Sequence, residues 1–116
     1  MRNKLTEEFN LTLQENINKF MGIINSKNYD YIHVSIHTME FNSSINLKDL
    51  DLKLDTDRLK IKSNSDFNLS IKLNKIKEQS YESRTHDIYN RKFEENALKF
   101  KMDTSDCISL GVFRSI

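Results

Sequence analysis

The sequence predicts an α+β fold in which an N-terminal amphipathic helix packs on a curled antiparallel β-meander of five to seven strands, with a partial barrel as its most curled form. Three observations predict it. Apolar residues recur at helical spacing near the N-terminus, they alternate with polar residues over short segments elsewhere, and clusters of Asp, Asn and Ser separate those segments. A chain of 116 residues has the usual size of one domain. We therefore expect a single domain over 1–116, with the helix at about 6–26 and the sheet at about 31–114.

The helix is predicted from Thr6 to about Ser26. Glu7 and Glu8 suit the positive end of the helix dipole. Seven apolar residues share one helical stripe: Leu5, Phe9, Leu13, Ile17, Phe20, Met21 and Ile24. Asn25 and Asn28 lie where the stripe ends, and Asn tolerates the left-handed conformation that closes many helices. This stripe should cover one face of the sheet.

Two strands are predicted next, over 31–41 and 45–55. The first alternates two semi-apolar faces, which is typical of a strand inside a sheet. In the second, Leu50, Leu52 and Leu54 alternate with charged residues. It therefore reads as one strand with one solvated face.

Short apolar alternations around Leu59 and over 67–73 continue the meander, and Asx-rich turns at 55–58 and 63–66 separate them. Near Ile76 the apolar positions change from odd to even numbers. That change predicts a bulge or a bend in the strand.

Residues 78–96 fit both helical and strand spacing, and we expect a loop followed by a strand. A hairpin is predicted from 98–102 and 107–113, with Gly111 marking a bulge or a close backbone approach. In the order of its elements, helix first and curled antiparallel sheet second, the chain resembles Sm-like and cystatin-like folds. A resemblance in element order implies nothing about function.

Composition excludes several function classes. The formal net charge of +1 argues against nonspecific electrostatic binding to nucleic acid or to an acidic membrane. No apolar run is long enough to span a bilayer and the start lacks a signal peptide, so we expect a cytoplasmic protein without a membrane partner. Two glycines cannot form a phosphate-binding glycine loop. The single Cys107 cannot form an internal disulfide, which makes homo-oligomerisation the plausible support for a thin core.

His33 and His37 provide the most chemically suggestive pattern. They share one strand face, where two imidazoles could bind a metal or act as acid and base. The His-Val-Ser segment resembles half of a two-histidine phosphoesterase motif, but His86 is followed by Asp87 and Ile88, so the second half is missing. No acidic or Cys ligand lies in register. A metal- or histidine-dependent enzyme is therefore only the third hypothesis, and no cofactor or metal is predicted.

The first hypothesis is a small non-catalytic module that binds a protein partner. Tyr81, Tyr89, Arg84 and Arg91 in the 78–96 segment are the candidate contact residues, since Tyr and Arg are enriched at interface hot spots. Frequent Asn, Lys and Ile, with no Pro or Trp, also fits an AT-rich coding sequence. This usage suggests a phage or mobile-element inhibitor that binds a host or defence protein.

The alternative hypothesis is a nucleic-acid or nucleotide-binding module. Five lysines occupy the polar phase of their predicted strands and could line one sheet face: Lys60, Lys62, Lys72, Lys99 and Lys101. Their alternating partners Asn68, Ser70 and Asn74 include no aromatic residue for base stacking. Lysines that keep a sheet soluble and block edge pairing would give the same pattern.

Overall fold

The computed structural model describes residues 4–64 and 67–116, and its first element is the predicted helix, α1 (Lys4–Ser26). Four stripe residues, Leu13, Ile17, Phe20 and Ile24, are buried. Leu5 lies outside the side chains that the structure describes.

The helix ends without glycine, but the left-handed residue is Lys27 rather than an asparagine, with a φ of 58°. The Lys27 amide donates to the carbonyl of Ile24 at 3.1 Å. Asn28 continues the chain, and its amide donates to the Ser26 hydroxyl at 3.2 Å.

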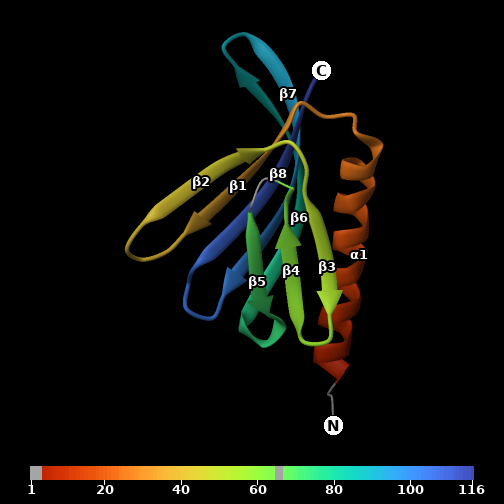
Figure 1. The fold of residues 1–116 in the computed structure, drawn as a ribbon, viewed down its shortest axis with the longest axis vertical. Helices are drawn as coiled ribbons and strands as arrows, with labels where there is room; N and C mark the ends of the chain where they lie inside the picture. The colour runs from red at the N-terminus through yellow and green to blue at the C-terminus, as the bar shows by residue number, and fades with distance from the viewer. Residues whose placement is uncertain (1–3, 65–66) are drawn as a thin grey trace.

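The helix packs on antiparallel strands, as predicted, so the α+β fold class is confirmed (Figure 1). The prediction of five to seven strands in one meander is wrong, because the described residues form eight strands in two sheets. The five-stranded sheet has the order β2-β1-β8-β7-β6, the three-stranded sheet has the order β3-β4-β5, and neither closes into a barrel. The strands are β1 (Tyr31–His37), β2 (Asn42–Leu47), β3 (Asp51–Asp55), β4 (Arg58–Lys62), β5 (Asn68–Lys72), β6 (Ile76–Ile88), β7 (Arg91–Met102) and β8 (Cys107–Ser115).

The predicted strand over 45–55 is two strands, because the chain changes sheets at Lys48–Leu50. The Tyr29 hydroxyl donates to the carbonyl of Lys48 at 2.8 Å. The Asp49 carboxylate accepts from the Ser63 hydroxyl at 3.0 Å and from the Asn64 amide at 3.1 Å. These contacts come from distant parts of the chain, and they hold the bend that ends β2.

The prediction of a loop at the start of 78–96 is also wrong. Strands β6 and β7 form one long hairpin whose two turn residues, Tyr89 and Asn90, both have positive φ. The irregularity predicted near Ile76 is confirmed, since a 3-10 turn (Leu73–Lys75) precedes it and the β6–β7 register shifts between Ile76 and Glu78.

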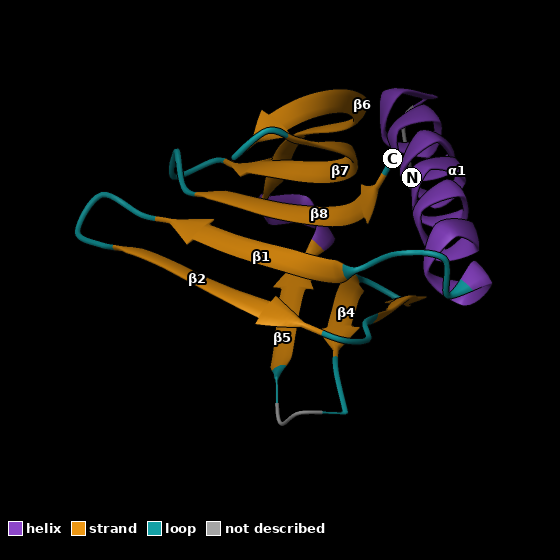
Figure 2. Ribbon diagram, turned by 90° about the horizontal axis from the view of Figure 1, so that it is seen from above, coloured by secondary structure: helices purple, strands orange, loops and turns teal. Residues whose placement is uncertain are grey.

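A single hydrophobic cluster lies between α1 and the inner faces of both sheets. Its fully buried members include Phe20 from the helix, Phe100 and Leu110 from the large sheet, and Leu59 and Ile61 from the small sheet. The helix packs on β3, β6 and β7, while the β1–β2 hairpin extends away from it (Figure 2). No helix in the described residues is both long and apolar enough to cross a membrane.

Candidate functional site

The four predicted partner-binding residues all lie on the β6–β7 hairpin, whose tip projects from the sheet at the top of Figure 1. Tyr89 is at the tip and is 96% exposed. Arg91 follows the turn, with its guanidinium carbon 5.6 Å from the ring centre of Phe93. Arg84 lies farther down β6 and donates to the Glu82 carboxylate.

Tyr81 differs from these residues because it points into the molecule. Its hydroxyl donates to the Asn96 side-chain oxygen at 3.1 Å, and the Lys19 ammonium lies 6.0 Å from its ring centre. Burial raises the pKa of the Tyr81 hydroxyl, and the Glu94 charge adds to this effect. Tyr81 therefore joins the helix to the sheet and is not available at the surface in the way that Tyr89 is.

The turn formed by Tyr89 and Asn90 has residue types that are unusual for its backbone conformation. Two-residue hairpin turns with positive φ at both central positions favour Asn-Gly or Gly-Gly, because a side chain at positive φ crowds the backbone. Here Tyr89 has a φ of 49° and Asn90 a φ of 65°. A bulky aromatic residue thus occupies a left-handed position at the most exposed point of the hairpin.

An aromatic strip, defined here as Tyr31, His86, Phe93 and Phe113, runs from the hairpin across the outer face of the large sheet. Tyr31 and Phe113 stack with ring centres 4.9 Å apart and planes 9° apart. The His86 ring centre is 5.8 Å from that of Phe113, and Phe93 lies opposite His86 in the β6–β7 register. Three strands and the start of a fourth thus place their rings on one face.

Two acidic residues hold the strip in place. Glu95 Oε1 lies 2.7 Å from His86 Nε2, and Glu95 Oε2 lies 2.5 Å from the place where a Cβ on Gly111 would be. The group close to Gly111 is thus the Glu95 side chain, and neither a bulge nor a close backbone approach is seen there. Asp30 accepts hydrogen bonds from the Ser115 hydroxyl and amide, which lower the pKa of its carboxyl group, and these bonds tie the end of β8 to the start of β1.

The sequence pattern singled out Tyr89 but did not assemble the strip. Tyr31, Phe93 and Phe113 occupy the outward phase of their strands, where polar residues would be usual on a solvated face. The outward position of these aromatic residues was the only feature of the sequence that indicated the strip. The grouping of the rings depends on strand order, which the sequence did not reveal.

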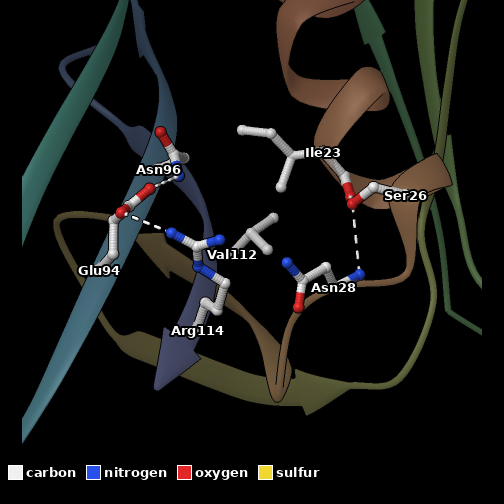
Figure 3. A pocket seen from close by; sticks show the side chains of 7 residues that line it. All are labelled: Ile23, Ser26, Asn28, Glu94, Asn96, Val112 and Arg114. Atoms are coloured by element: carbon white, nitrogen blue, oxygen red, sulfur yellow. Dashed lines mark hydrogen bonds and ion pairs between the residues drawn. The ribbon is translucent and has the colours of Figure 1, made fainter. Parts of the chain in front are cut away.

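A small pocket of about 170 Å³ lies on the opposite, inner side of β7 and β8, beside the C-terminal end of α1 (Figure 3). Three of its polar side chains, Glu94, Asn96 and Arg114, bond to one another. Arg114 donates to Glu94 at 2.9 Å, and Asn96 donates to the other Glu94 oxygen at 3.2 Å. The hydrogen bonds from Asn96 and Arg114 lower the pKa of the Glu94 carboxyl group. This network links the two strands next to the helix end.

The five predicted nucleic-acid-binding lysines do not share one face, because they belong to two sheets. Lys60, Lys62 and Lys72 lie on the outer face of the small sheet. Lys99 and Lys101 lie on the outer face of the large sheet, and Lys99 pairs with Glu82 at 3.4 Å. The change of sheet at 73–75 separates the two groups along the chain.

His33 and His37 share the outer face of β1, each beside an asparagine of β2. His33 Nδ1 lies 2.6 Å from Asn46 Oδ1, and His37 Nδ1 lies 2.9 Å from Asn42 Oδ1. Across residues 4–64 and 67–116, no group of three His, Cys, Asp or Glu side chains is placed to hold a metal ion.

No family model, curated protein or solved structure matches this chain.

Proposed function

We propose that this chain is a non-catalytic interaction module of the cytoplasm, which binds a protein partner with the tip of the β6–β7 hairpin and the adjoining aromatic strip. The observation that carries the proposal is Tyr89, a 96%-exposed aromatic residue at positive φ. A left-handed conformation costs a residue with a side chain about 1–2 kcal/mol, and glycine would avoid that cost. Retaining Tyr at this position is understandable if its ring has a binding role.

The surroundings of Tyr89 support an interface. Ile88 is 37% exposed beside it, and Arg91 and the strip add the aromatic and guanidinium groups that are enriched at hot spots. The hairpin is paired without interruption from Ile88 opposite Arg91 to Glu78 opposite Lys101. A tip held by such pairing loses little conformational entropy on binding. A phage or mobile-element inhibitor that binds a host or defence protein remains the specific form of the proposal.

The Tyr89→Gly variant tests this proposal because it separates folding from binding. Glycine suits the positive φ, so the free energy of unfolding should stay the same or rise. Binding should weaken at least tenfold, because the anchor ring is lost. The measurement is quantitative capture of proteins from a low-GC bacterial lysate, with a urea midpoint for each variant.

The matched control is Leu11→Ala, which removes a 63%-exposed apolar side chain from the helix and should leave capture unchanged. If Tyr89→Gly captures the same protein as the unmodified chain in equal amounts, the hairpin tip is not the contact. The proposal also fails if the unmodified chain captures no protein whose capture is weakened by Tyr89→Gly.

A second candidate function is polyanion binding by the outer face of the small sheet. Five cations line this face: Lys53, Arg58, Lys60, Lys62 and Lys72. Lys53 lies directly opposite Lys60, and Arg58 directly opposite Lys72. Like charges in such positions are destabilising, and a bound phosphate chain would relieve the repulsion. Among the residues of β3, β4 and β5, only Asp51 and Asp55 are acidic on this face, and Asp55 pairs with Lys60 at 2.8 Å.

Labelled single-stranded DNA tests this candidate by fluorescence anisotropy. Binding should fall steeply with added salt, because each neutralised phosphate releases a counterion. Lys53→Gln with Lys72→Gln should weaken it, whereas Lys99→Gln with Lys101→Gln on the large sheet should not. Undetectable binding at low salt would exclude this function.

A further inference from the structure

The outermost strands of the two sheets are protected to very different degrees. Exposed strand edges invite pairing with another chain, and charged side chains, proline or a bulge normally prevent it. Strands β3, β5 and β6 each carry charged residues. Strand β2 reads Asn-Ser-Ser-Ile-Asn-Leu, without a charge or a proline, and its register with β1 is continuous from Asn42 to Leu47.

Apolar side chains are exposed beside the same edge. Ile45 on β2 is 44% exposed, Phe41 just before β2 is 60% exposed, and Met39 in the preceding turn is 90% exposed. Ile45 lies opposite Val34, which is buried, so the apolar inner face of the sheet continues onto β2. In the sheet order β2 is outermost and pairs with β1 alone, and the β1–β2 hairpin extends away from the helix (Figure 2).

The direction of the free backbone groups follows from one hydrogen bond. The Thr38 amide donates to the carbonyl of Phe41 at 2.9 Å, which makes these two a hydrogen-bonded pair. Bonded and non-bonded pairs alternate along antiparallel strands. Residues 43, 45 and 47 therefore bond towards β1, and the amides and carbonyls of Asn42, Ser44 and Asn46 face the free edge.

We propose that two copies of this chain pair antiparallel through their β2 edges and form one continuous ten-stranded sheet across a two-fold axis. The outward groups set the register: Ser44 lies opposite Ser44 of the second copy, and Asn42 lies opposite Asn46 of the second copy. Each of these is a hydrogen-bonded pair, so no outward backbone group of Asn42, Ser44 or Asn46 is left without a partner.

A second copy is the occupant that this edge fits best. A two-fold axis brings each residue near its own copy, so a charged strand would repel itself, and β2 has no charge. In this register Phe41 lies opposite Leu47 of the second copy. Ile45 lies diagonal to Ile45 of the second copy, within reach for side-chain contact. Pairing therefore covers Phe41 and Ile45, two of the three apolar side chains that the single chain exposes beside this edge.

Cysteine cross-linking in a Cys107→Ser background tests the register. The Cα atoms of a hydrogen-bonded antiparallel pair lie about 5.5 Å apart, within the range of a disulfide. Ser44→Cys should therefore form a covalent dimer on mild oxidation. Asn42→Cys is the matched control, because its two copies would lie four residues apart along the strand, roughly 14 Å, and should not cross-link.

The oligomeric state tests the edge itself, by sedimentation over a range of protein concentrations. The unmodified chain should be a dimer, and Ser44→Lys should weaken dimerisation by roughly a hundredfold, because it places like charges face to face. Asn68→Lys on β5 adds the same charge at another edge and should leave the dimer intact. Circular dichroism and the urea midpoint of Ser44→Lys should show an intact fold.

Three results would overturn the proposal. They are a monomer at every concentration, a dimer that Ser44→Lys does not weaken, and Asn42→Cys cross-linking as well as Ser44→Cys. If Ser44→Lys fails to fold, the cross-linking pair still decides between this register and any other.

Discussion

The two outermost strands of the large sheet, β6 and β2, are built in opposite ways. Strand β6 has thirteen residues, and the helix fastens its inner face: Asn16 donates to Gln79 at 2.5 Å, and Lys19 lies over the Tyr81 ring. Its outer face carries the Glu82–Arg84 ion pair. Strand β2 has six residues without a charge, and its inward Ile45 is 44% exposed.

The difference between β6 and β2 arises because one helix covers only part of a five-stranded sheet. Because α1 packs on β6, β7 and β3, it covers one end of the sheet and leaves the β1–β2 end with apolar side chains in solvent. A charged edge on a strand whose inner face packs against the helix suits a strand that must stay unpaired while its hairpin tip meets a partner. A neutral and exposed edge suits a strand that pairs.

The largest expected effect compares one core residue from each end. Leu98 on β7 is fully buried, so Leu98→Ala should lower the free energy of unfolding by about 2–5 kcal/mol. Ile45→Ala should cost less than about 1 kcal/mol in the single chain, because much of that side chain is already in water. Urea unfolding at a protein concentration where the chain is monomeric measures both. Equal losses would show that the β2 end is as well covered as the other.

A second prediction concerns pH and the charged edge. The hydrogen bond from Arg84, assisted by the charge of Lys99, lowers the pKa of the Glu82 carboxyl group in the folded chain. A lowered carboxyl pKa stabilises the fold above the unfolded pKa of about 4.3, and this contribution is lost as the pH falls through the lower folded value. Glu82→Gln should therefore be less stable at neutral pH and should lose less stability on acidification. Parallel curves of urea midpoint against pH for the two proteins would contradict this.

The sequence predicted the parts of the fold that depend on local patterns. The stripe from Leu13 to Ile24 marked the helix, and the alternation before and after 103–106 marked the hairpin of β7 and β8. The change of parity at Ile76 marked a real irregularity, since the chain passes there from the small sheet to the large one.

The sequence could not predict features that depend on distant contacts. The bend at Lys48–Leu50 is held by Tyr29, Ser63 and Asn64, and without it the segment 45–55 looks like one strand. Strand β6 was missed because Tyr89 and Asn90 form a hairpin turn without the glycine that usually marks one.

The candidate site likewise has one part that the sequence predicts and one part that it does not. Tyr89 could be singled out by residue type alone, and the structure places it at an exposed tip. The grouping of Tyr31, His86 and Phe113 could not be seen, because it requires β1 beside β8 and β8 beside β7. Strand order of that kind is set by packing of the whole chain and not by any single segment.

The smallest expected effect is that of salt on the two edges. The Glu82–Arg84 pair is exposed, so salt should screen it, and the stability difference between the unmodified chain and Glu82→Gln should shrink as ionic strength rises. Strand β2 has no charge to screen. The dissociation constant of a β2-paired dimer, measured by sedimentation equilibrium, should therefore change less than about twofold between low and high salt. A tenfold change would mean that charged groups outside β2 hold the copies together, and the neutrality of this edge would then not explain the pairing.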